Sequence, residues 1–162
     1  MEKQNSSGLL SARNLSLIVL IIAMGVSGYL SYLKIDTSAS PACSVGQVFD
    51  CGTVLNSVYS EILGVPIAFL GFGVNVVAFS LLLLEPRIPF LKRYAAPFVF
   101  GLLLFAFLFS VYLVYVQAVL ITKYCPWCLS HEALVTIVFL LSVKRLLDWM
   151  NAEQLETEQV SD

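Results

Sequence analysis

Residues 97–122 read PFVFGLLLFAFLFSVYLVYVQAVLIT and contain no charged side chain. A helix needs about 20 consecutive apolar residues to cross the hydrocarbon core of a bilayer. Residues 15–33 and 62–84 are apolar and uncharged in the same way, and a fourth apolar stretch covers residues 126–147. Because lipid cannot bond to backbone polar groups, each stretch should be helical. The sequence therefore predicts an all-α membrane protein built as a four-transmembrane-helix bundle.

The composition excludes an ordinary soluble domain. The chain has 162 residues, which suits one domain, and is 59% hydrophobic and only 12% charged. Ordinary soluble domains are about 25% charged. The net charge of -2 predicts no nucleic-acid partner. The chain also lacks the glycine-rich motifs that bind nucleotide phosphates.

Basic residues are unevenly distributed around the four spans. Lys34 and Lys123 lie on one side, and the other side has more: Lys3, Arg13, Arg87, Lys92, Arg93, Lys144 and Arg145. The positive-inside rule then places both termini in the cytoplasm, with the loops 34–61 and 123–125 outside it. We expect a cytoplasmic N-terminus over 1–14, a membrane domain over 15–148, and a disordered cytoplasmic tail over 149–162.

All four cysteines fall in or at the edge of the two outward loops. Cys43 and Cys51 belong to the first, and Cys125 and Cys128 form a CPWC motif in the second. Pro126 suits the first position of a helix, which places Cys125 at the helix N-terminus. The helix dipole there, and nearby Lys123, favour a thiolate. A lowered pKa promotes thiol–disulfide exchange, so the pattern indicates redox-active cysteines.

Two structural alternatives remain open for the cysteines. Four thiolates can hold a zinc ion, but seven residues separate Cys43 from Cys51, which is wider than the usual zinc spacing. Two static disulfides are the other alternative. A CxxC disulfide is short and strained, which favours redox cycling over a static role. The wide spacing of the first pair predicts that no metal is bound.

A few polar residues near the spans are further candidates. His131, the only histidine, suits a thiolate or quinol partner or an interfacial residue that reaches water. Glu132 suits a proton relay or an interfacial anchor. Asn75 should face the bundle interior, bonded to a neighbouring helix or to a quinone. Asp50 either raises the pKa of the adjacent Cys51 thiol or is an ordinary exposed loop acid. Ser57, taken alone, would be a helix cap or a packed hydroxyl.

Several motifs together resemble the vitamin K epoxide reductase family. They are CSVGQVFDC at 43–51, NSVYSEILGVP at 56–66 and CPWC at 125–128, and the resemblance covers about residues 10–148. It implies a four-helix bundle around a quinone, with a short helix over about 53–60 in the first outward loop. Cys125 and Cys128 would be the active pair, with Cys128 facing the quinone. Cys43 and Cys51 would be the shuttle pair, and Ser57 would help to hold the quinone or the loop.

The resemblance to the prokaryotic branch implies a membrane thiol–disulfide oxidoreductase. It would reoxidise a thioredoxin-like partner and reduce a lipid quinone such as ubiquinone or menaquinone. No fused thioredoxin-like domain follows residue 143, so we expect that partner to be a separate chain. Vertebrate members have a tyrosine where this chain has Glu132, which favours an ordinary quinone over an epoxide. The non-enzymatic alternative is a four-span adaptor stapled by structural disulfides. The unrelated disulfide-bond protein B type of quinone reductase has its CxxC in the first outward loop and its wider cysteine pair in the second. This chain has the reverse order, which argues against that type.

Overall fold

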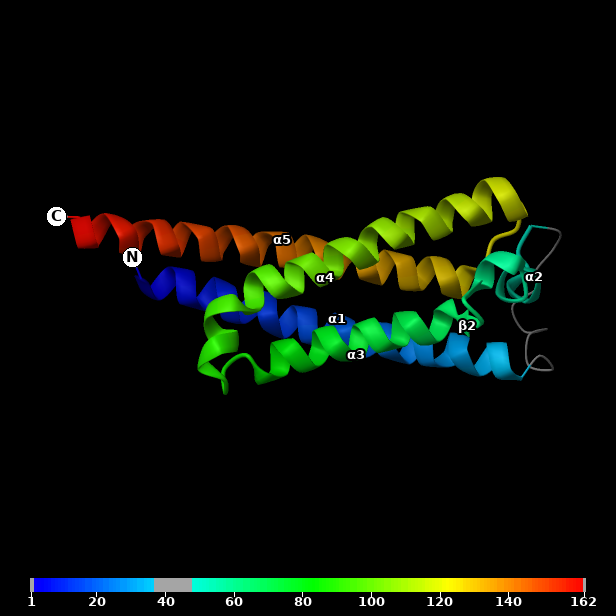
Figure 1. The fold of residues 1–162 in the computed structure, drawn as a ribbon, viewed down its shortest axis with the longest axis horizontal. Coiled ribbons are helices and arrows are strands. Elements are labelled where there is room, and N and C mark those ends of the chain that lie inside the picture. Colours follow the sequence, from blue (N-terminus) through cyan, green and yellow to red (C-terminus); the bar gives the residue numbers. More distant parts are fainter. Residues whose placement is uncertain (1, 37–47, 162) are drawn as a thin grey trace.

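Four long helices form an antiparallel bundle in the computed structural model, which describes residues 2–36 and 48–161. They are α1 (Glu2–Ile35), α3 (Ile67–Leu84), α4 (Pro89–Tyr115) and α5 (Pro126–Ser161). Helices α1 and α4 each pack against both α3 and α5. Both ends of the chain lie at one end of the bundle, and the loop that carries α2 lies at the other (Figure 1).

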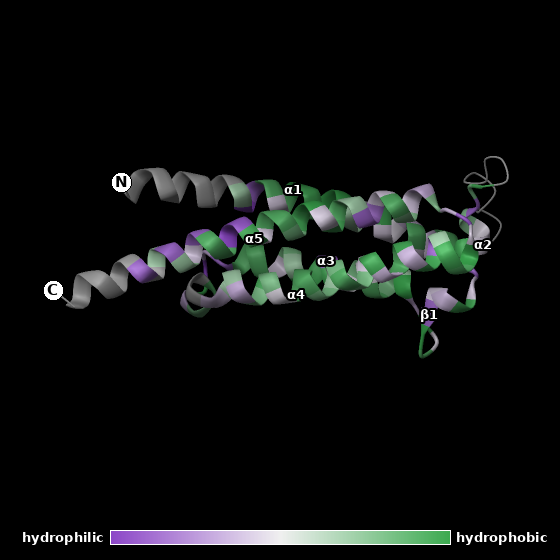
Figure 2. Cartoon of the chain, turned by 90° about the horizontal axis from the view of Figure 1, so that it is seen from above, coloured by the Kyte–Doolittle hydropathy of each residue, from purple (hydrophilic) through white to green (hydrophobic). Residues whose placement is uncertain are grey.

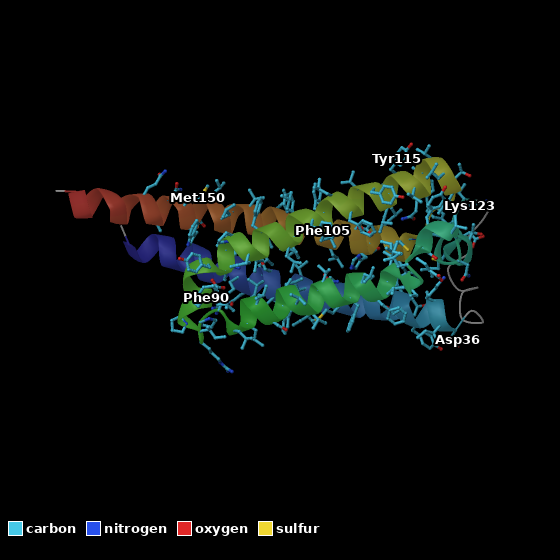
Figure 3. All side chains as sticks on the ribbon, viewed as in Figure 1. Asp36, Phe90, Phe105, Tyr115, Lys123 and Met150 are labelled. Atoms are coloured by element: carbon cyan, nitrogen blue, oxygen red, sulfur yellow. The ribbon has the colours of Figure 1, made fainter. Side chains whose placement is uncertain are left out.

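The bundle interior is apolar and closely packed. One buried cluster includes a residue from each long helix, namely Leu20, Leu82, Leu103 and Val138. Small buried residues such as Ala78 lie beside them and allow close approach of the helices, which is how helices associate in lipid. Large apolar side chains also point outward, as at Phe105, which lies midway along the bundle (Figure 3). Hydrophobic residues dominate the shared length of the helices (Figure 2).

Three stretches of the described residues are long and apolar enough to cross a membrane: Ala12–Ile35, Ile67–Leu84 and Tyr94–Ile121. These agree with the first three predicted spans. The fourth predicted span, 126–147, lies within α5, which carries His131 and Glu132 near its start and is not among those three described stretches. The protein is thus a helical membrane protein, and its fourth crossing stays a prediction.

The start of the second predicted span is corrected by the structure. Residues 62–66, expected to be helical, belong to a hairpin in which β1 (Glu61–Ile62) pairs antiparallel with β2 (Val65–Pro66). The two turn residues, Leu63 and Gly64, have φ values of 52° and 81°. Two successive positive φ values suit a tight two-residue hairpin and prevent a right-handed helix. The helix therefore begins only at Ile67.

Short helical segments cover the loop end of the bundle. The single helix expected over 53–60 is replaced by two pieces, α2 (Cys51–Leu55) and the 3-10 turn η2 (Val58–Ser60). At the other end of the chain, α5 runs on to Ser161, through residues expected to be a disordered tail. The sequence AEQLE at 152–156 has high helix propensity, which explains this difference.

Candidate functional site

The CPWC motif lies where α5 begins. The helix starts at Pro126, as the sequence predicts, and Cys125 immediately precedes it with no exposed surface. The backbone N–H of Cys128 donates to Sγ of Cys125 over 3.2 Å. Both cysteines are free thiols. The first turn of α5 therefore holds the two sulfur atoms on one side of the helix start.

The pKa of the Cys125 thiol is lowered by this arrangement. The main cause is the hydrogen bond from the Cys128 thiol, and the N–H groups of Cys128 and Trp127 act in the same direction. Burial opposes them by disfavouring the charged form. The direction matches the sequence-based prediction, although hydrogen bonds to sulfur, and not nearby Lys123, are the chief cause. The thiolate form of Cys125 is thus favoured more than that of an ordinary cysteine.

A buried amide fixes the backbone just before the helix. Oε1 of Gln117 accepts the N–H of Cys125 over 3.0 Å, and the side chain of Gln117 is buried. Gln117 belongs to a π-helix, η3 (Val116–Ile121), that ends at Thr122 with a left-handed φ of 55°. Such π-helical turns are frequent at functional sites. The widened turn directs Gln117 toward the cysteine motif.

Main-chain hydrogen bonds join the two cysteine-bearing loops beside the cysteines. Phe49 and Tyr124 form a parallel β-bridge. In it, Tyr124 donates its N–H to the carbonyl of Val48, and Asp50 donates its N–H to the carbonyl of Tyr124, both over 3.0 Å. The residues that follow, Cys51 and Cys125, consequently share one buried cluster.

Of the predicted shuttle pair, Cys43 and Cys51, the structure describes only Cys51. Cys51 is fully buried at the start of α2 and takes part in a disulfide. Cys43 lies outside the described residues. Asp50 caps α2, with its carboxylate accepting from the hydroxyl and N–H of Thr53. These bonds lower the pKa of Asp50 and make it the cap of α2, a role that neither of its two sequence-based interpretations included.

An apolar cavity of about 310 Å³ lies beneath the loop segments and between the helices. It brings together five of the candidate residues: Ser57 from the loop, Asn75 from α3, and Cys128, His131 and Glu132 from α5. Most of its remaining lining is aliphatic or aromatic. Small-molecule sites of this kind combine an apolar wall with a few polar groups. An apolar ring with two carbonyl oxygens, which is the chemistry of a quinone, fits this lining.

A chain of polar side chains crosses the bundle at the cavity. Nδ2 of Asn75 donates to Oγ of Ser27 over 3.4 Å and lies 3.0 Å from Nε2 of His131. Nδ1 of His131 is 3.8 Å from Oε1 of Glu132. Asn75 therefore bonds a neighbouring helix, as one of its two interpretations predicted, and also lines the cavity.

Lys34 ties the loop segments to the end of α1. Its Nζ donates to the carbonyl of Leu55 over 2.8 Å and to Oγ of Ser60 over 3.2 Å, and lies 3.0 Å from Oε1 of Glu61. Ser57 lies in the same loop segment, and its hydroxyl donates to the carbonyl of Val54. All of these loop residues except Glu61 line the cavity, so Lys34 fastens one wall of it.

Gln117 and Lys34 were missed as site residues by sequence reasoning. A signal existed for Gln117, since an amide within the uncharged run 97–122 needs a buried partner. No comparable signal marked Lys34, because its partners come from Leu55, Ser60 and Glu61, which only the folded loop brings near.

Paired cysteines over an apolar cavity in a helical bundle define a class, that of membrane proteins with a buried thiol site. The chain belongs to the vitamin K epoxide reductase family, whose model matches residues 14–143. Among its relatives is thiol-disulfide oxidoreductase LTO1 of Arabidopsis thaliana, 36% identical over 124 residues. That match covers 73% of this chain and 32% of LTO1. The chain thus corresponds to about a third of the length of that relative.

Proposed function

We propose that this chain is a membrane thiol–disulfide oxidoreductase that reoxidises a thioredoxin-like protein and passes the electrons to a lipid quinone. The observation that carries the proposal is the position of Cys128. Its side chain belongs to the CPWC pair and also lines the apolar cavity of about 310 Å³. A thiol there can exchange with its neighbour on one side and meet an apolar electron acceptor on the other.

The proposed electron path uses the four cysteines in order. A thiol of the reduced partner attacks the disulfide between Cys43 and Cys51 at Cys43, and Cys51 is released. With the CPWC pair oxidised, Cys51 attacks Cys125, and Cys128 is released at the cavity as a thiolate that takes up a proton and becomes a thiol. The second thiol of the partner then displaces Cys43 from the mixed disulfide. Cys43 displaces Cys125 from Cys51, which restores the Cys43–Cys51 disulfide and leaves both CPWC cysteines reduced. Re-formation of the Cys125–Cys128 disulfide releases two electrons and two protons, which reduce the quinone to a quinol. The partner ends with one new disulfide, so the electrons balance.

Burial of the exchanging sulfurs supports this path. Cys51 and Cys125 are both fully buried in one cluster, beneath the loops that the Phe49–Tyr124 bridge joins. Thiol–disulfide exchange requires direct contact between sulfur atoms, and a shared cluster shortens the movement that contact needs. The relative LTO1 is a thiol-disulfide oxidoreductase, which agrees with this reaction class.

The proposed orientation places the cysteines outside the cytoplasm. Both ends of the chain lie at one end of the bundle (Figure 1), the end that carries the larger share of basic residues. The positive-inside rule assigns that end to the cytoplasm. The thiol site then faces the oxidising side, where disulfides form and persist.

The test combines quinone reduction with capture of the protein partner. We expect Cys128→Ser to reduce no quinone in membranes, with the spectrum of the added quinone as the readout. Ser130→Ala is the matched control, because Ser130 is exposed and lies two residues after Cys128 in α5. This variant should retain activity. Cys51→Ala mixed with the oxidised partner should accumulate a mixed disulfide, because Cys43 attacks the partner's disulfide and no Cys51 thiol displaces it. A non-enzymatic adaptor with structural disulfides predicts no quinone reduction by the unsubstituted protein and no mixed disulfide.

A further inference from the structure

The only histidine of the chain lies in the polar chain at the cavity. His131 lines the cavity, and its ring contacts α3 on two sides: Nε2 lies 3.0 Å from Nδ2 of Asn75, and a Cβ placed on Gly71 would lie 3.5 Å from Cε1. The ring therefore lies at ordinary van der Waals distance from the position of that Cβ, close against α3. An ionisable side chain inside a membrane bundle is costly to bury and is typically functional.

The orientation of the Asn75 amide points to one tautomer of this histidine. An amide nitrogen only donates, so Nδ2 of Asn75 is the donor and Nε2 of His131 is the acceptor. A neutral histidine that accepts at Nε2 carries its hydrogen on Nδ1, which here points toward Glu132 at 3.8 Å. The second hydrogen of the Asn75 amide is used by Oγ of Ser27. The amide then has only its carbonyl oxygen left to offer to the cavity, as an acceptor.

We propose that His131 carries a proton between the Cys128 thiol and the quinone, and that Asn75 follows its protonation state. The inference rests on the proposed function and deepens it. When His131 gains a proton at Nε2, Asn75 must turn its carbonyl toward the ring, which turns its NH2 group toward the cavity. A quinone carbonyl needs such a donor. When His131 gives up the proton, Asn75 turns back and its carbonyl accepts from a quinol hydroxyl.

The proton balance is complete. Oxidation of two thiols to a disulfide releases two electrons and two protons, and reduction of a quinone to a quinol consumes the same number. His131 takes the proton of the Cys128 thiol, one helical turn before it, and gives it to one quinone oxygen. The proton of Cys125 passes to water, a step that its lowered pKa favours, and one from water reaches the other oxygen. His131 ends each cycle as it began.

A single histidine permits a direct spectroscopic test. We expect the 15N spectrum of the reduced, full-length protein, labelled only at histidine, to show hydrogen on Nδ1 and none on Nε2. In Asn75→Ala the preference should disappear, and the Nε2–H tautomer should become populated. Predominant Nε2–H in the unsubstituted protein would overturn the proposal. This readout needs no quinone and no substitution of His131.

The kinetic test uses His131→Gln, which retains an amide acceptor for Asn75 but cannot ionise. General acid–base catalysis contributes about 100- to 10,000-fold, so single-turnover reduction of ubiquinone-1 by the reduced protein should fall by about 100-fold or more. The rate at which the oxidised cysteines of His131→Gln oxidise dithiothreitol in a single turnover should stay within about threefold of that of the unsubstituted protein. This control distinguishes a loss of proton transfer from misfolding. Ser130→Ala is the control.

The possible outcomes separate this inference from the proposed function. If His131→Gln reduces ubiquinone-1 as fast as the unsubstituted protein, the proton carrier is refuted and the oxidoreductase stands. If the unsubstituted protein reduces no quinone, the proposed function fails and this inference fails with it. Equal losses in quinone reduction and dithiothreitol oxidation would indicate a structural role for His131 and would also overturn the inference.

Discussion

At the scale of single residues, the site depends on hydrogen bonds to sulfur and to the backbone beside it. Cys125 receives one bond from the Cys128 thiol and another from the Cys128 N–H. Gln117 holds the N–H of Cys125 itself. Since all these groups are buried or half-buried, each bond acts with little competition from water.

Removal of the Cys128 thiol should raise the pKa of Cys125. The thiol is the largest of the groups that lower this pKa, while the backbone N–H groups remain in Cys128→Ala. The thiolate fraction of Cys125 near neutral pH should therefore fall. Thiolate absorbance near 240 nm as a function of pH, measured in a Cys43→Ala/Cys51→Ala background, would record the change. An unchanged or lower midpoint would contradict the assigned cause.

Loss of the Gln117 side chain should destabilise the cysteine turn. Gln117→Ala leaves the buried N–H of Cys125 without its acceptor, which costs about 1–3 kcal/mol. The melting temperature in detergent should fall, and oxidation of dithiothreitol should slow because the two sulfurs are held less firmly. Gln117→Glu retains an acceptor oxygen and should recover the exchange rate. Equal rates in all three proteins would show that the bond has no positioning role.

Sequence reasoning at this scale identified individual residues better than their partners. The CPWC motif predicted both the start of α5 and the lowered pKa of Cys125, because both effects are local. The pairing of Asn75 with His131 was not predictable, since the two are 56 positions apart. The rotation of each helix about its axis decides which polar side chains meet. This rotation cannot be read from the sequence of an apolar helix alone.

At the scale of elements, two ion pairs hold segments together at opposite ends of the bundle. Lys34 ties the end of α1 to the loop segments at the cavity. Arg145 of α5 makes bonds of 2.7 Å to both carboxylate oxygens of Glu85, directly after α3. The first fastens the wall of the site, and the second fastens the helices far from it.

Substitution of Lys34 should loosen the loop segments. Lys34→Met keeps the aliphatic stem but loses the bonds to Leu55, Ser60 and Glu61. Amide hydrogen exchange over residues 54–61 should then increase by about tenfold or more, which corresponds to about 1.4 kcal/mol of local opening. Glu61→Gln removes only the ion pair and should have a smaller effect. A larger increase in hydrogen exchange in Glu61→Gln than in Lys34→Met would refute the role of Lys34 in holding the loop segments.

Removal of the Glu85 carboxylate should destabilise the bundle without affecting the site. The Arg145 side chain is 3% exposed, so Glu85→Gln leaves a buried charge poorly compensated. Breaking one partner of a buried pair costs about 3–5 kcal/mol. The melting temperature should fall clearly, while the pKa of Cys125 stays unchanged. Lys144→Gln, an exposed neighbour of Arg145, is the matched control and should melt as the unsubstituted protein does.

At the scale of the whole molecule, the antiparallel bundle separates a thiol end from an end that holds both termini. Lys123 and Asp36 lie at the thiol end, and Phe90 and Met150 lie toward the other (Figure 3). Apolar runs predicted the helices of this bundle, because length and hydropathy suffice for that. The hairpin at 61–66 escaped prediction, because Leu63 adopts a left-handed conformation that leucine rarely favours.

The two ends should lie on opposite sides of the membrane. In a background with all four cysteines replaced by serine, Leu63→Cys should react with a membrane-impermeant maleimide added outside, because Leu63 is fully exposed on the hairpin. Met150→Cys, exposed near the other end, should react only after the membrane is permeabilised. Labelling of Met150→Cys in intact cells would refute the proposed orientation.

The bridge between Phe49 and Tyr124 is made of main-chain atoms alone. Its hydrogen bonds are indifferent to which side chains those positions carry, with one exception: a proline at 50 or 124 would remove a donor. The outer rim can therefore change its sequence to suit a new electron donor while the sulfur atoms beneath keep their spacing. The rim residues that would contact an electron donor can therefore change without disturbing the cysteines, although the two sets lie within a few residues of each other.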